Sequence, residues 1–296
     1  CQQALKPSPQ SPPFDGRRGV RYSYQKPGLG AVWRCAVRAD VAPHTGKCEE
    51  ILAARGGTHG EHRDSWIWQN RPVQAENNAF IIGGRKIAYY NTLEALPDWG
   101  ALGVDLVVDC TGRATVRAGA QAHLDRGAKR VLVSAPSKSL QDCDAVLLPG
   151  INLEQYDPDK HRIISMASCT TNALAPVVKI LREHYGIKSG FFSTVHAYTN
   201  SQSLTDQPMK DRRDSWAAAE NIIPSSSGAA KALNFIWPDL KMTGKAYRVP
   251  VRTGSIAEVN AILERSTTTE EVRNAFREAA ARPPLKGIMD VLEEEW

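Results

Sequence analysis

The sequence contains no apolar run long enough to span a bilayer, and its proline-rich, polar beginning lacks the apolar core of a signal peptide. Its six cysteines, at positions 1, 35, 48, 110, 143 and 169, show neither close paired spacing nor grouping with histidines. These absences argue against a membrane-spanning protein, a disulfide framework and a structural zinc site. We therefore expect free thiols, no metal, and a cytoplasmic protein.

An excess of positive charge is also absent from most of the chain. The net charge is +5, yet residues 1–72 hold 11 Lys and Arg against 6 Asp and Glu, and the rest is balanced at 26 of each. A basic, proline-rich segment is usually solvated, so we do not expect specific nucleic-acid binding. At 296 residues with 42% apolar content, the chain is long enough for two globular domains.

Residues 1–72 show proline clusters and scattered Trp and Arg, without a sustained helical or strand period. From Asn78 the sequence pattern changes. Two apolar runs between Ala79 and Tyr90 flank a Gly-Gly turn and predict a hairpin. Residues 104–110 predict a buried strand, 115–126 a helix and 130–134 a second strand. Strand, helix and strand in this order predict a parallel unit.

Further along, residues 162–165 predict a strand, and about 170–184 predict a helix that ends at Gly186. Residues 191–197 predict a strand that enters a more antiparallel region. A late amphipathic helix is expected over 266–281, with Thr267 to Thr269 as candidate caps.

Cys169 lies where the strand gives way to the helix, in the run Ser-Cys-Thr-Thr-Asn from residue 168 to 172. Unpaired amide groups and the positive end of the helix dipole lower the pKa of a thiol placed there. A lone cysteine is more often a buried structural residue, but the flanking hydroxyl groups favour an anion-binding, reactive site. His196 ends a predicted strand, and on spacing alone it is a weak candidate for the base that such a thiol needs.

Four motifs resemble the phosphorylating glyceraldehyde-3-phosphate dehydrogenase family in order and spacing. They are ASCTTNALAP (167–176), TVHAYTN (194–200), NIIPSSSGAAK (221–231) and RVP (248–250). The resemblance extends back through CTG (110–112) and SAP (134–136) and forward to about Gly287, roughly two thirds of the chain. It implies an α/β protein with an incomplete Rossmann-like parallel-sheet cofactor domain and an α+β catalytic domain with a mostly antiparallel sheet.

The resemblance also implies the chemistry. Cys169 would attack the aldehyde of glyceraldehyde 3-phosphate and His196 would accept the proton. Hydride would pass to NAD or NADP, and inorganic phosphate would release 1,3-bisphosphoglycerate from the thioester. Implied sites are Thr199 and Arg248 for the substrate phosphate, Ser168, Thr170, Ser227 and Gly228 for inorganic phosphate, and Cys110, Thr111, Gly112 and Ser134 for the cofactor. Arg248 could instead be only a surface charge, and Ser225 to Ser227 only a polar turn.

The chain departs from the family pattern in two places. Where the family has an Arg-Arg-x-Arg run, this chain has Arg212-Arg-Asp-Ser-Trp, so that Asp214 stands where an arginine is expected unless Arg212 or Arg213 substitutes for it. The cofactor fingerprint G-x-G-x-x-G is also missing, since Gly28-Leu-Gly30 is followed by Ala-Val-Trp33. Either residues 20–72 are a frame-shifted translation, in which a shifted Trp codon restores the glycine, or the segment is divergent.

We expect three parts: an aberrant or disordered segment over 1–72, the remainder of the NAD(P)-binding domain over 73–168, and a truncated catalytic domain over 169–296. The family also implies a homotetramer. The sequence does not distinguish NAD from NADP. Two alternatives stay open: an erythrose-4-phosphate dehydrogenase, and a catalytically silent fragment that acts as a binding subunit.

Overall fold

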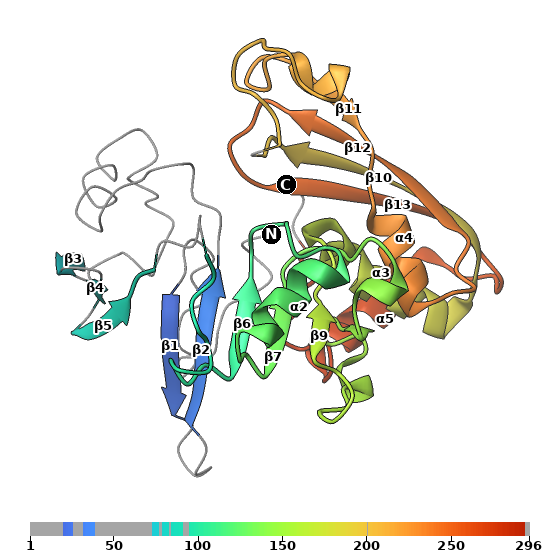
Figure 1. Ribbon diagram of the computed structural model, residues 1–296. Helices are drawn as coiled ribbons and strands as arrows, with labels where there is room; N and C mark the ends of the chain where they lie inside the picture. Colours follow the sequence, from blue (N-terminus) through green and yellow to red (C-terminus); the bar gives the residue numbers. More distant parts are fainter. Residues whose placement is uncertain are drawn as a thin grey trace. The chain divides into compact units, whose positions relative to one another are not determined.

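The computed structural model describes residues 20–25, 32–38, 73–76, 79–82, 84–90, 95–199 and 201–293. These residues fall into two compact units (Figure 1). The N-terminal unit lies within Ser8–Ala145 and Asp157–Met166, and the C-terminal unit lies within Val146–Tyr156 and Ala167–Trp296. Within the described residues, no helix is both long and apolar enough to cross a membrane.

The N-terminal unit contains a six-stranded sheet in the order β1-β2-β6-β7-β9-β8. Strands β2 (Val32–Arg38), β6 (Leu106–Asp109), β7 (Arg130–Val133) and β9 (Ile163–Ser165) are mutually parallel. Strand β1 (Val20–Gln25) pairs with β2 in the antiparallel sense, and β8 (Ala145–Val146) lies at the other edge. The predicted strand, helix and parallel strand are thus confirmed, with α2 (Arg117–Asp125) as the helix.

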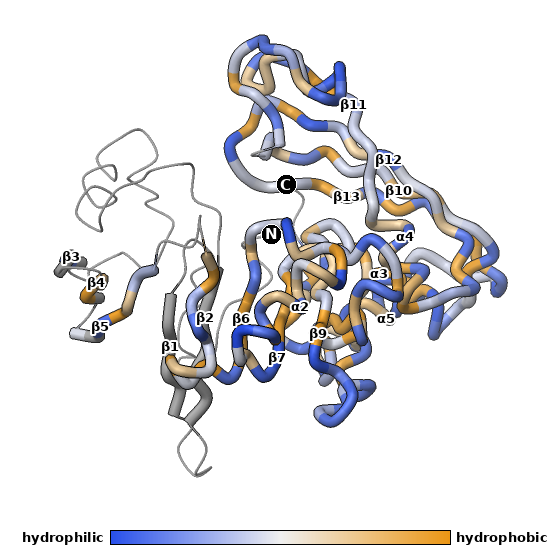
Figure 2. The backbone as a smooth tube through the Cα atoms, viewed as in Figure 1, coloured by the Kyte–Doolittle hydropathy of each residue, from blue (hydrophilic) through white to orange (hydrophobic). Residues whose placement is uncertain are grey.

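The core of this sheet is made of β-branched side chains, which pack well on a pleated surface. Val107 and Val131 are fully buried and Ile163 is 1% exposed, so the central strands appear as apolar stretches in Figure 2. Helix α2 contacts β7 and β9 and buries Ala120, His123 and Leu124. Burial on both faces is typical of a parallel sheet covered by helices.

Two strands lie in the stretch that showed no strand period. β1 and β2 form there because β2 pairs with β6, and such long-range pairing is invisible in local sequence. Residues 1–19, 26–31 and 39–72 lie outside the described residues, and with them the Gly28-Leu-Gly30 sequence. Trp33 belongs to strand β2, which begins at Val32.

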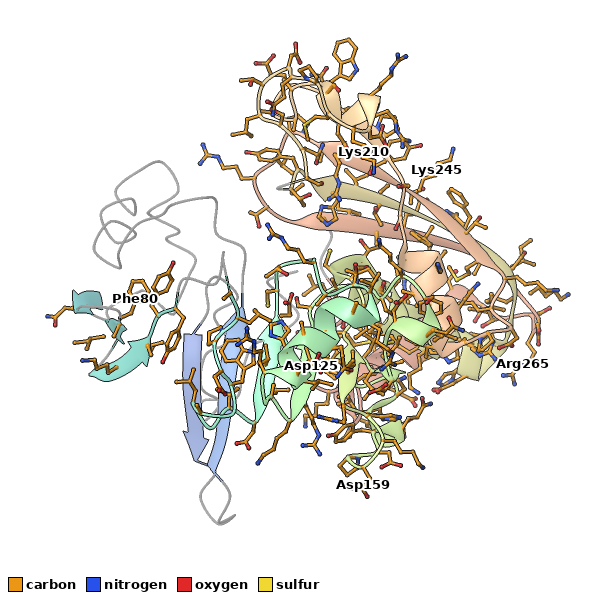
Figure 3. The ribbon with its side chains drawn as sticks, viewed as in Figure 1. Phe80, Asp125, Asp159, Lys210, Lys245 and Arg265 are labelled. Carbon is orange, nitrogen blue, oxygen red and sulfur yellow. The ribbon has the colours of Figure 1, made fainter. Side chains whose placement is uncertain are left out.

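The predicted hairpin after residue 79 is confirmed. Strands β3 (Val73–Glu76), β4 (Ala79–Ile82) and β5 (Arg85–Ala88) form an antiparallel sheet of their own. Gly84 has φ 77°, which suits the tight turn between β4 and β5. Phe80, which is labelled in Figure 3, packs edge-on against Tyr89 with ring centroids 5.8 Å apart.

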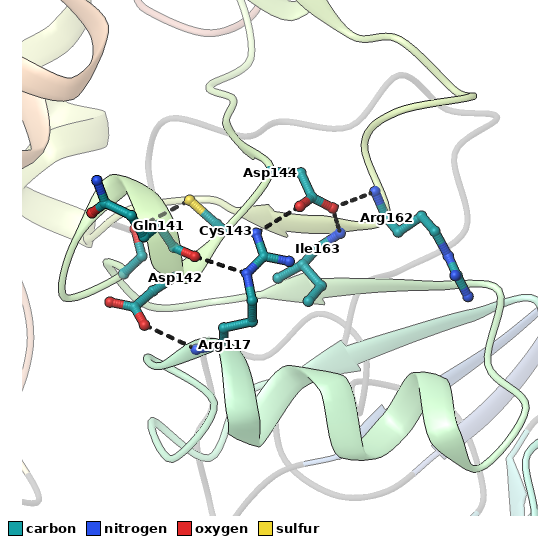
Figure 4. A network of polar contacts seen from close by, with 8 residues as sticks. Arg117, Gln141, Asp142, Cys143, Asp144, Arg162 and Ile163 are labelled. Atoms are coloured by element: carbon teal, nitrogen blue, oxygen red, sulfur yellow. Dashed lines mark hydrogen bonds and ion pairs between the residues drawn. The ribbon is translucent and has the colours of Figure 1, made fainter.

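A network of hydrogen bonds and an ion pair connects the start of α2 with Asp144, which precedes β8, and with the start of β9 (Figure 4). Arg117 donates from Nη2 to Asp144 Oδ1 at 2.7 Å and from Nε to the Gln141 carbonyl at 2.7 Å. The other Asp144 oxygen accepts the backbone N–H groups of Arg162 and Ile163, each at 2.8 Å. One carboxylate therefore fixes both the start of the helix and the start of β9.

The C-terminal unit contains a four-stranded sheet in the order β11-β12-β10-β13. Strand β10 (Ile187–Ala197) is parallel to β12 (Met242–Val249) and antiparallel to β13 (Ser255–Leu263), and β11 (Ile223–Ser225) is antiparallel to β12. The expected mostly antiparallel second sheet is confirmed. Helices α3 (Cys169–Tyr185) and α4 (Ala229–Ile236) contact this sheet, and α5 (Thr269–Ala281) contacts α3.

The ends of α3 and α5 follow local sequence signals. Gly186 caps α3 with φ 70°, as the sequence predicts. Thr268 and Glu271 form a reciprocal capping box at the start of α5, within the expected range of caps.

Alternation along β10 gives the sheet two unlike faces. Phe192 and Thr194 are buried on the face that the helices contact, whereas Phe191 and Val195 are exposed on the other. Phe192 lies opposite Gly244 of β12, and a Cβ at Gly244 would come within 2.4 Å of the Phe192 ring. The ring therefore fills the space that a side chain at Gly244 would need.

Candidate active site

Cys169 is the first residue of helix α3 and is exposed. Ser168 is the N-cap, and its hydroxyl oxygen accepts the N–H of Thr171 at 3.1 Å. The preceding residue, Ala167, has φ 54° although it is not glycine and is only 3% exposed. A left-handed residue of this kind costs energy and persists where the surroundings enforce it, which is common beside reactive groups.

His196 stands next to the thiol. Its Nε2 lies 3.4 Å from Cys169 Sγ. The hydrogen bond with His196 lowers the pKa of Cys169 from 9.0 to about 7, against an opposing effect of burial. The same hydrogen bond raises the pKa of His196. A thiol with a pKa near neutrality is substantially ionised under physiological conditions, as a nucleophile requires.

The second ring nitrogen of His196 contacts two groups. Nδ1 lies 2.7 Å from the carbonyl oxygen of Ala197 and 2.7 Å from Nη1 of Arg248. Arg248 Nη1 also donates to the Ala197 carbonyl at 3.2 Å. This proximity comes from the sheet, because His196 and Arg248 are directly paired across the parallel strands β10 and β12.

The structure thus brings together three predicted site residues, Cys169, His196 and Arg248. The sequence also allows Arg248 as a mere surface charge, but the side chain is half-buried against the His196 ring. Thr199 follows β10 closely. Its side chain is exposed, its hydroxyl lies 3.0 Å from that of Ser201, and its N–H donates to Gln202 Oε1 at 3.2 Å.

The residues predicted for inorganic phosphate lie at two helix starts. Ser168 and Thr170 flank Cys169 at the start of α3. Gly228 is the N-cap of α4, and the Ser227 hydroxyl accepts the N–H of Ala229 at 3.3 Å. Helix starts present N–H groups and positive potential to an anion, so these positions suit a phosphate chemically.

Arg213, considered as a substitute at the phosphate site, already has a partner. It donates to both carboxylate oxygens of Asp211, at 3.1 and 2.7 Å. These bonds lower the pKa of Asp211 to about 2. Asp214 lies in the same short helical turn, η4 (Arg212–Ser215). Recruitment of Arg213 to a phosphate would first require the loss of this ion pair.

The residues predicted for the cofactor lie at the carboxyl ends of parallel strands in the N-terminal unit. Cys110, Thr111 and Gly112 follow β6, and Ser134 follows β7 and hydrogen bonds to the Cys110 thiol. Gly112 has φ 73°, and a Cβ there would meet no atom within 4 Å. Hydroxyl groups and open backbone at the carboxyl edge of a parallel sheet fit the sugar and nicotinamide part of a dinucleotide.

A buried chain of hydrogen bonds supports this loop, and the sequence did not reveal it. Asp109 accepts both the N–H and the hydroxyl of Thr111, at 2.9 and 2.7 Å. Its other oxygen lies 3.1 Å from His123 Nε2, and Trp99 Nε1 donates to His123 Nδ1 at 3.1 Å. Because Nδ1 accepts from Trp99, neutral His123 carries its proton on Nε2 and donates to Asp109. An aspartate in an otherwise apolar strand was the available signal.

Within the described residues, no group of three or more His, Cys, Asp or Glu side chains is placed to hold an ion. The fold and the site define an α/β protein with a parallel-sheet unit and a helix-start cysteine paired with a histidine.

Comparison with known proteins gives the family. Residues 168–296 match the family model described as glyceraldehyde 3-phosphate dehydrogenase, C-terminal domain. The chain is 48% identical over 229 residues to the glyceraldehyde-3-phosphate dehydrogenase of Kitasatospora aureofaciens, covering 76% of this chain and 67% of that protein. The chain belongs to the phosphorylating glyceraldehyde-3-phosphate dehydrogenase family.

Two further relatives agree. Identity is 46% over 227 residues with the glyceraldehyde-3-phosphate dehydrogenase of Geobacillus stearothermophilus, covering 75% of this chain and 66% of that protein. It is 50% over 198 residues with the Streptomyces coelicolor enzyme of the same name, covering 66% and 58%. The chain therefore spans about two thirds or less of the length of these relatives.

Proposed function

We propose that this chain oxidises glyceraldehyde 3-phosphate to 1,3-bisphosphoglycerate through a thioester on Cys169. The observation that carries the proposal is the contact of 3.4 Å between Cys169 Sγ and His196 Nε2, together with a thiol pKa of about 7. The Cys169 thiolate attacks the aldehyde carbon, and the new oxygen becomes the hydroxyl of a hemithioacetal. His196 then accepts that hydroxyl proton as hydride leaves the same carbon.

A bound NAD or NADP supplies the hydride acceptor. The residues of this chain that would hold it are Cys110, Thr111, Gly112 and Ser134, since they place hydroxyl groups and accessible backbone at the carboxyl edge of the parallel sheet. Inorganic phosphate near Ser168, Thr170, Ser227 and Gly228 then attacks the thioester carbon. The carbon–sulfur bond breaks, the acyl phosphate leaves, and Cys169 returns to the thiolate form.

Thr199 and Arg248 would hold the phosphate of the substrate itself. An arginine fork matches the oxygens of a phosphate, and Arg248 makes no ion pair with any described carboxylate. Its charge is thus available to an anion. A four-carbon phosphorylated aldehyde, erythrose 4-phosphate, remains the second candidate substrate because it carries the same two reactive groups.

The test separates thioester formation from phosphate attack. The full chain is mixed with glyceraldehyde 3-phosphate and NAD or NADP without phosphate, and the peptide that contains Cys169 is weighed by mass spectrometry. We expect an acyl adduct on Cys169 that disappears when phosphate is added, no adduct in Cys169→Ser, and a normal adduct in Cys143→Ala. Absence of the adduct with both cofactors would refute the proposal.

We further propose that the chain forms a homo-oligomer, a tetramer as the family implies, in the cytoplasm. The sheet face of the C-terminal unit that lies away from the helices exposes Phe191, Val195 and Ile256, the last at 72%. Across this face, Ser193 stands between Glu258 and Lys245 (Figure 3 labels Lys245), so charges of both signs flank the apolar residues. Such a face can pair with a copy of itself.

Ile256→Glu tests the oligomer. We expect the variant to elute as a smaller species in light-scattering chromatography, whereas Lys188→Glu, on an exposed residue at the other end of β10, should not change the mass.

Free thiols support the cytoplasmic assignment. Among the residues whose side chains the structure describes, the cysteines are Cys110, Cys143 and Cys169, and all three are free thiols.

A further inference from the structure

One nitrogen of His196 has two neighbours that make opposite demands on it. The Ala197 carbonyl at 2.7 Å can only accept a hydrogen bond, so it requires a proton on Nδ1. The Arg248 guanidinium, with Nη1 also at 2.7 Å, can only donate, so it requires a lone pair on Nδ1. A single ring nitrogen satisfies one of these neighbours at a time.

The choice at Nδ1 decides what Nε2 can do, because a neutral imidazole carries one proton. When Arg248 donates to Nδ1, the proton lies on Nε2 and points at Cys169 Sγ, 3.4 Å away. His196 then stabilises the thiolate, but Nε2 has no lone pair with which to accept a proton. When Nδ1–H donates to Ala197, Nε2 carries a lone pair and can act as a base.

We propose that Arg248 is a positioning residue that couples occupancy of the substrate-phosphate site to the tautomer of His196. In the empty site Arg248 holds the Nε2–H tautomer. An anion that draws Arg248 away from Nδ1 allows the Nδ1–H tautomer, which the Ala197 carbonyl stabilises. This inference rests on the proposed function, since it takes Arg248 as the residue that binds the substrate phosphate.

The surroundings of Arg248 support such movement. Its hydrogen bonds among the described residues are those to His196 Nδ1 and the Ala197 carbonyl, and neither acceptor is a carboxylate. A dianionic phosphate is a far stronger acceptor for a guanidinium than an imidazole nitrogen. The guanidinium therefore gains by turning to a phosphate, and the Ala197 carbonyl remains in place to receive Nδ1–H.

Protons balance in this scheme. As the thiolate attacks the aldehyde, the new oxygen takes a proton from solvent, because Nε2 carries only a lone pair in the Nδ1–H tautomer. The ring stays neutral, and the product is a hemithioacetal with a hydroxyl group. When hydride leaves, the hydroxyl proton passes to Nε2, and the resulting imidazolium later releases this proton to solvent. If Arg248 still occupied Nδ1, Nε2 would already carry the proton of the ring and could not accept another.

The test reads the tautomer directly. The full chain is labelled with ¹⁵N-histidine, and the two ring nitrogens of His196 are followed by NMR at a pH where the ring is neutral. His196→Asn identifies the signals. The probe is sn-glycerol 3-phosphate, which has the phosphate but no aldehyde to react with Cys169, and its binding is measured separately by calorimetry. The matched variant is Arg248→Met, which keeps length and removes both donors.

In the free wild-type chain we expect Nδ1 to be unprotonated, and saturation with sn-glycerol 3-phosphate should move its resonance to the protonated range. In Arg248→Met, Nδ1 should be protonated with or without the probe. A protonated Nδ1 in the free wild-type chain would overturn the inference.

Two other results separate the inference from the proposed function. If the probe binds to the wild-type chain but leaves the tautomer unchanged, the coupling is wrong and the phosphate site stands. If the probe does not bind at saturating concentration, the assignment of the substrate-phosphate site fails and the coupling fails with it.

Discussion

Cys169 at the start of α3 and His196 near the end of β10 meet with Sγ and Nε2 3.4 Å apart, although 27 residues separate them in sequence. Neither secondary structure nor hydrophobic pattern sets this distance. It depends on how α3 packs against the sheet of the C-terminal unit, to which both residues belong.

The first prediction concerns thiol reactivity. Alkylation of Cys169 by iodoacetamide should rise with pH around a midpoint near 7, because His196 lowers the thiol pKa to about 7. Burial raises the pKa of Cys110 and Cys143. At pH 7 Cys169 should therefore react at least about fivefold faster than either, after allowing for the lower nucleophilicity of a less basic thiolate.

Peptide mapping after brief labelling measures these rates. In His196→Asn the midpoint for Cys169 should shift upward toward that of an ordinary thiol. The apparent midpoint belongs to the coupled pair, so both residues contribute to it. Equal labelling of Cys110, Cys143 and Cys169 would show that Cys169 is not activated.

The second prediction concerns Ala167, which holds φ 54° in a buried position. Ala167→Val should lower the free energy of unfolding by about 2 kcal/mol or more, because a β-branched residue is poorly tolerated in the left-handed region. Ala167→Gly should stay within about 1 kcal/mol of wild type, since relief of strain offsets the greater freedom of the unfolded chain. Urea unfolding measures both, and equal effects of the two changes would contradict the strain.

The third prediction concerns Trp99, whose indole N–H donates to the buried His123. Trp99→Phe leaves His123 Nδ1 without that donor and should cost about 1–3 kcal/mol of unfolding free energy. Trp216→Phe is the matched control, because Trp216 is 60% exposed and should change stability by less than about 0.5 kcal/mol. A loss for Trp99→Phe no larger than the loss for Trp216→Phe would contradict a stabilising role of this hydrogen bond.

The fourth prediction concerns Asp144. Asp144→Ala leaves the backbone N–H groups of Arg162 and Ile163 unpaired and should cost about 1–3 kcal/mol, whereas Asp125→Ala on the exposed end of α2 should cost about 0.5 kcal/mol or less. A cost for Asp144→Ala no larger than that of Asp125→Ala would refute the network's role.

The same residue gives a pH dependence. Burial opposes the shift, but hydrogen bonds from Ile163 and Arg117 leave the pKa of Asp144 below its ordinary value of 3.8. The folded state then binds fewer protons than the unfolded state near that pH, so the stabilisation is present above 3.8 and is lost as pH falls through the lower, folded value. The stability difference between wild type and Asp144→Asn should therefore shrink on acidification in this range. A constant difference from pH 6 to pH 2 would be inconsistent with it.

Sequence predicted those elements whose signals are local. Gly84 before β5, Gly186 at the end of α3 and Thr268 at the start of α5 each act through the backbone of their own segment, and the structure has all three. Strand β2 was missed because its partner β6 lies about 70 residues further along the chain, and β1 joins the sheet only through β2.

The active site likewise combines features that local sequence predicts with features that depend on tertiary structure. Cys169 and His196 stood out through motifs, but the contact between His196 and Arg248 depends on strand register, which no local pattern specifies. The left-handed Ala167 was likewise invisible, because alanine carries no signal for positive φ. The contact between Asp109 and His123, which supports the loop after β6, likewise depends on the packing of α2 on the sheet, which no local pattern specifies.

Phe192 and Gly244 face each other across β10 and β12, with room for one side chain between them. The residues at positions 192 and 244 therefore share one volume, and the size of one limits the size of the other. In related sequences, a residue larger than glycine at position 244 should occur together with a residue smaller than phenylalanine at position 192. Sequences in which only the glycine is replaced should be rare. We therefore expect the residues at positions 192 and 244 to change together during evolution, and not independently of each other.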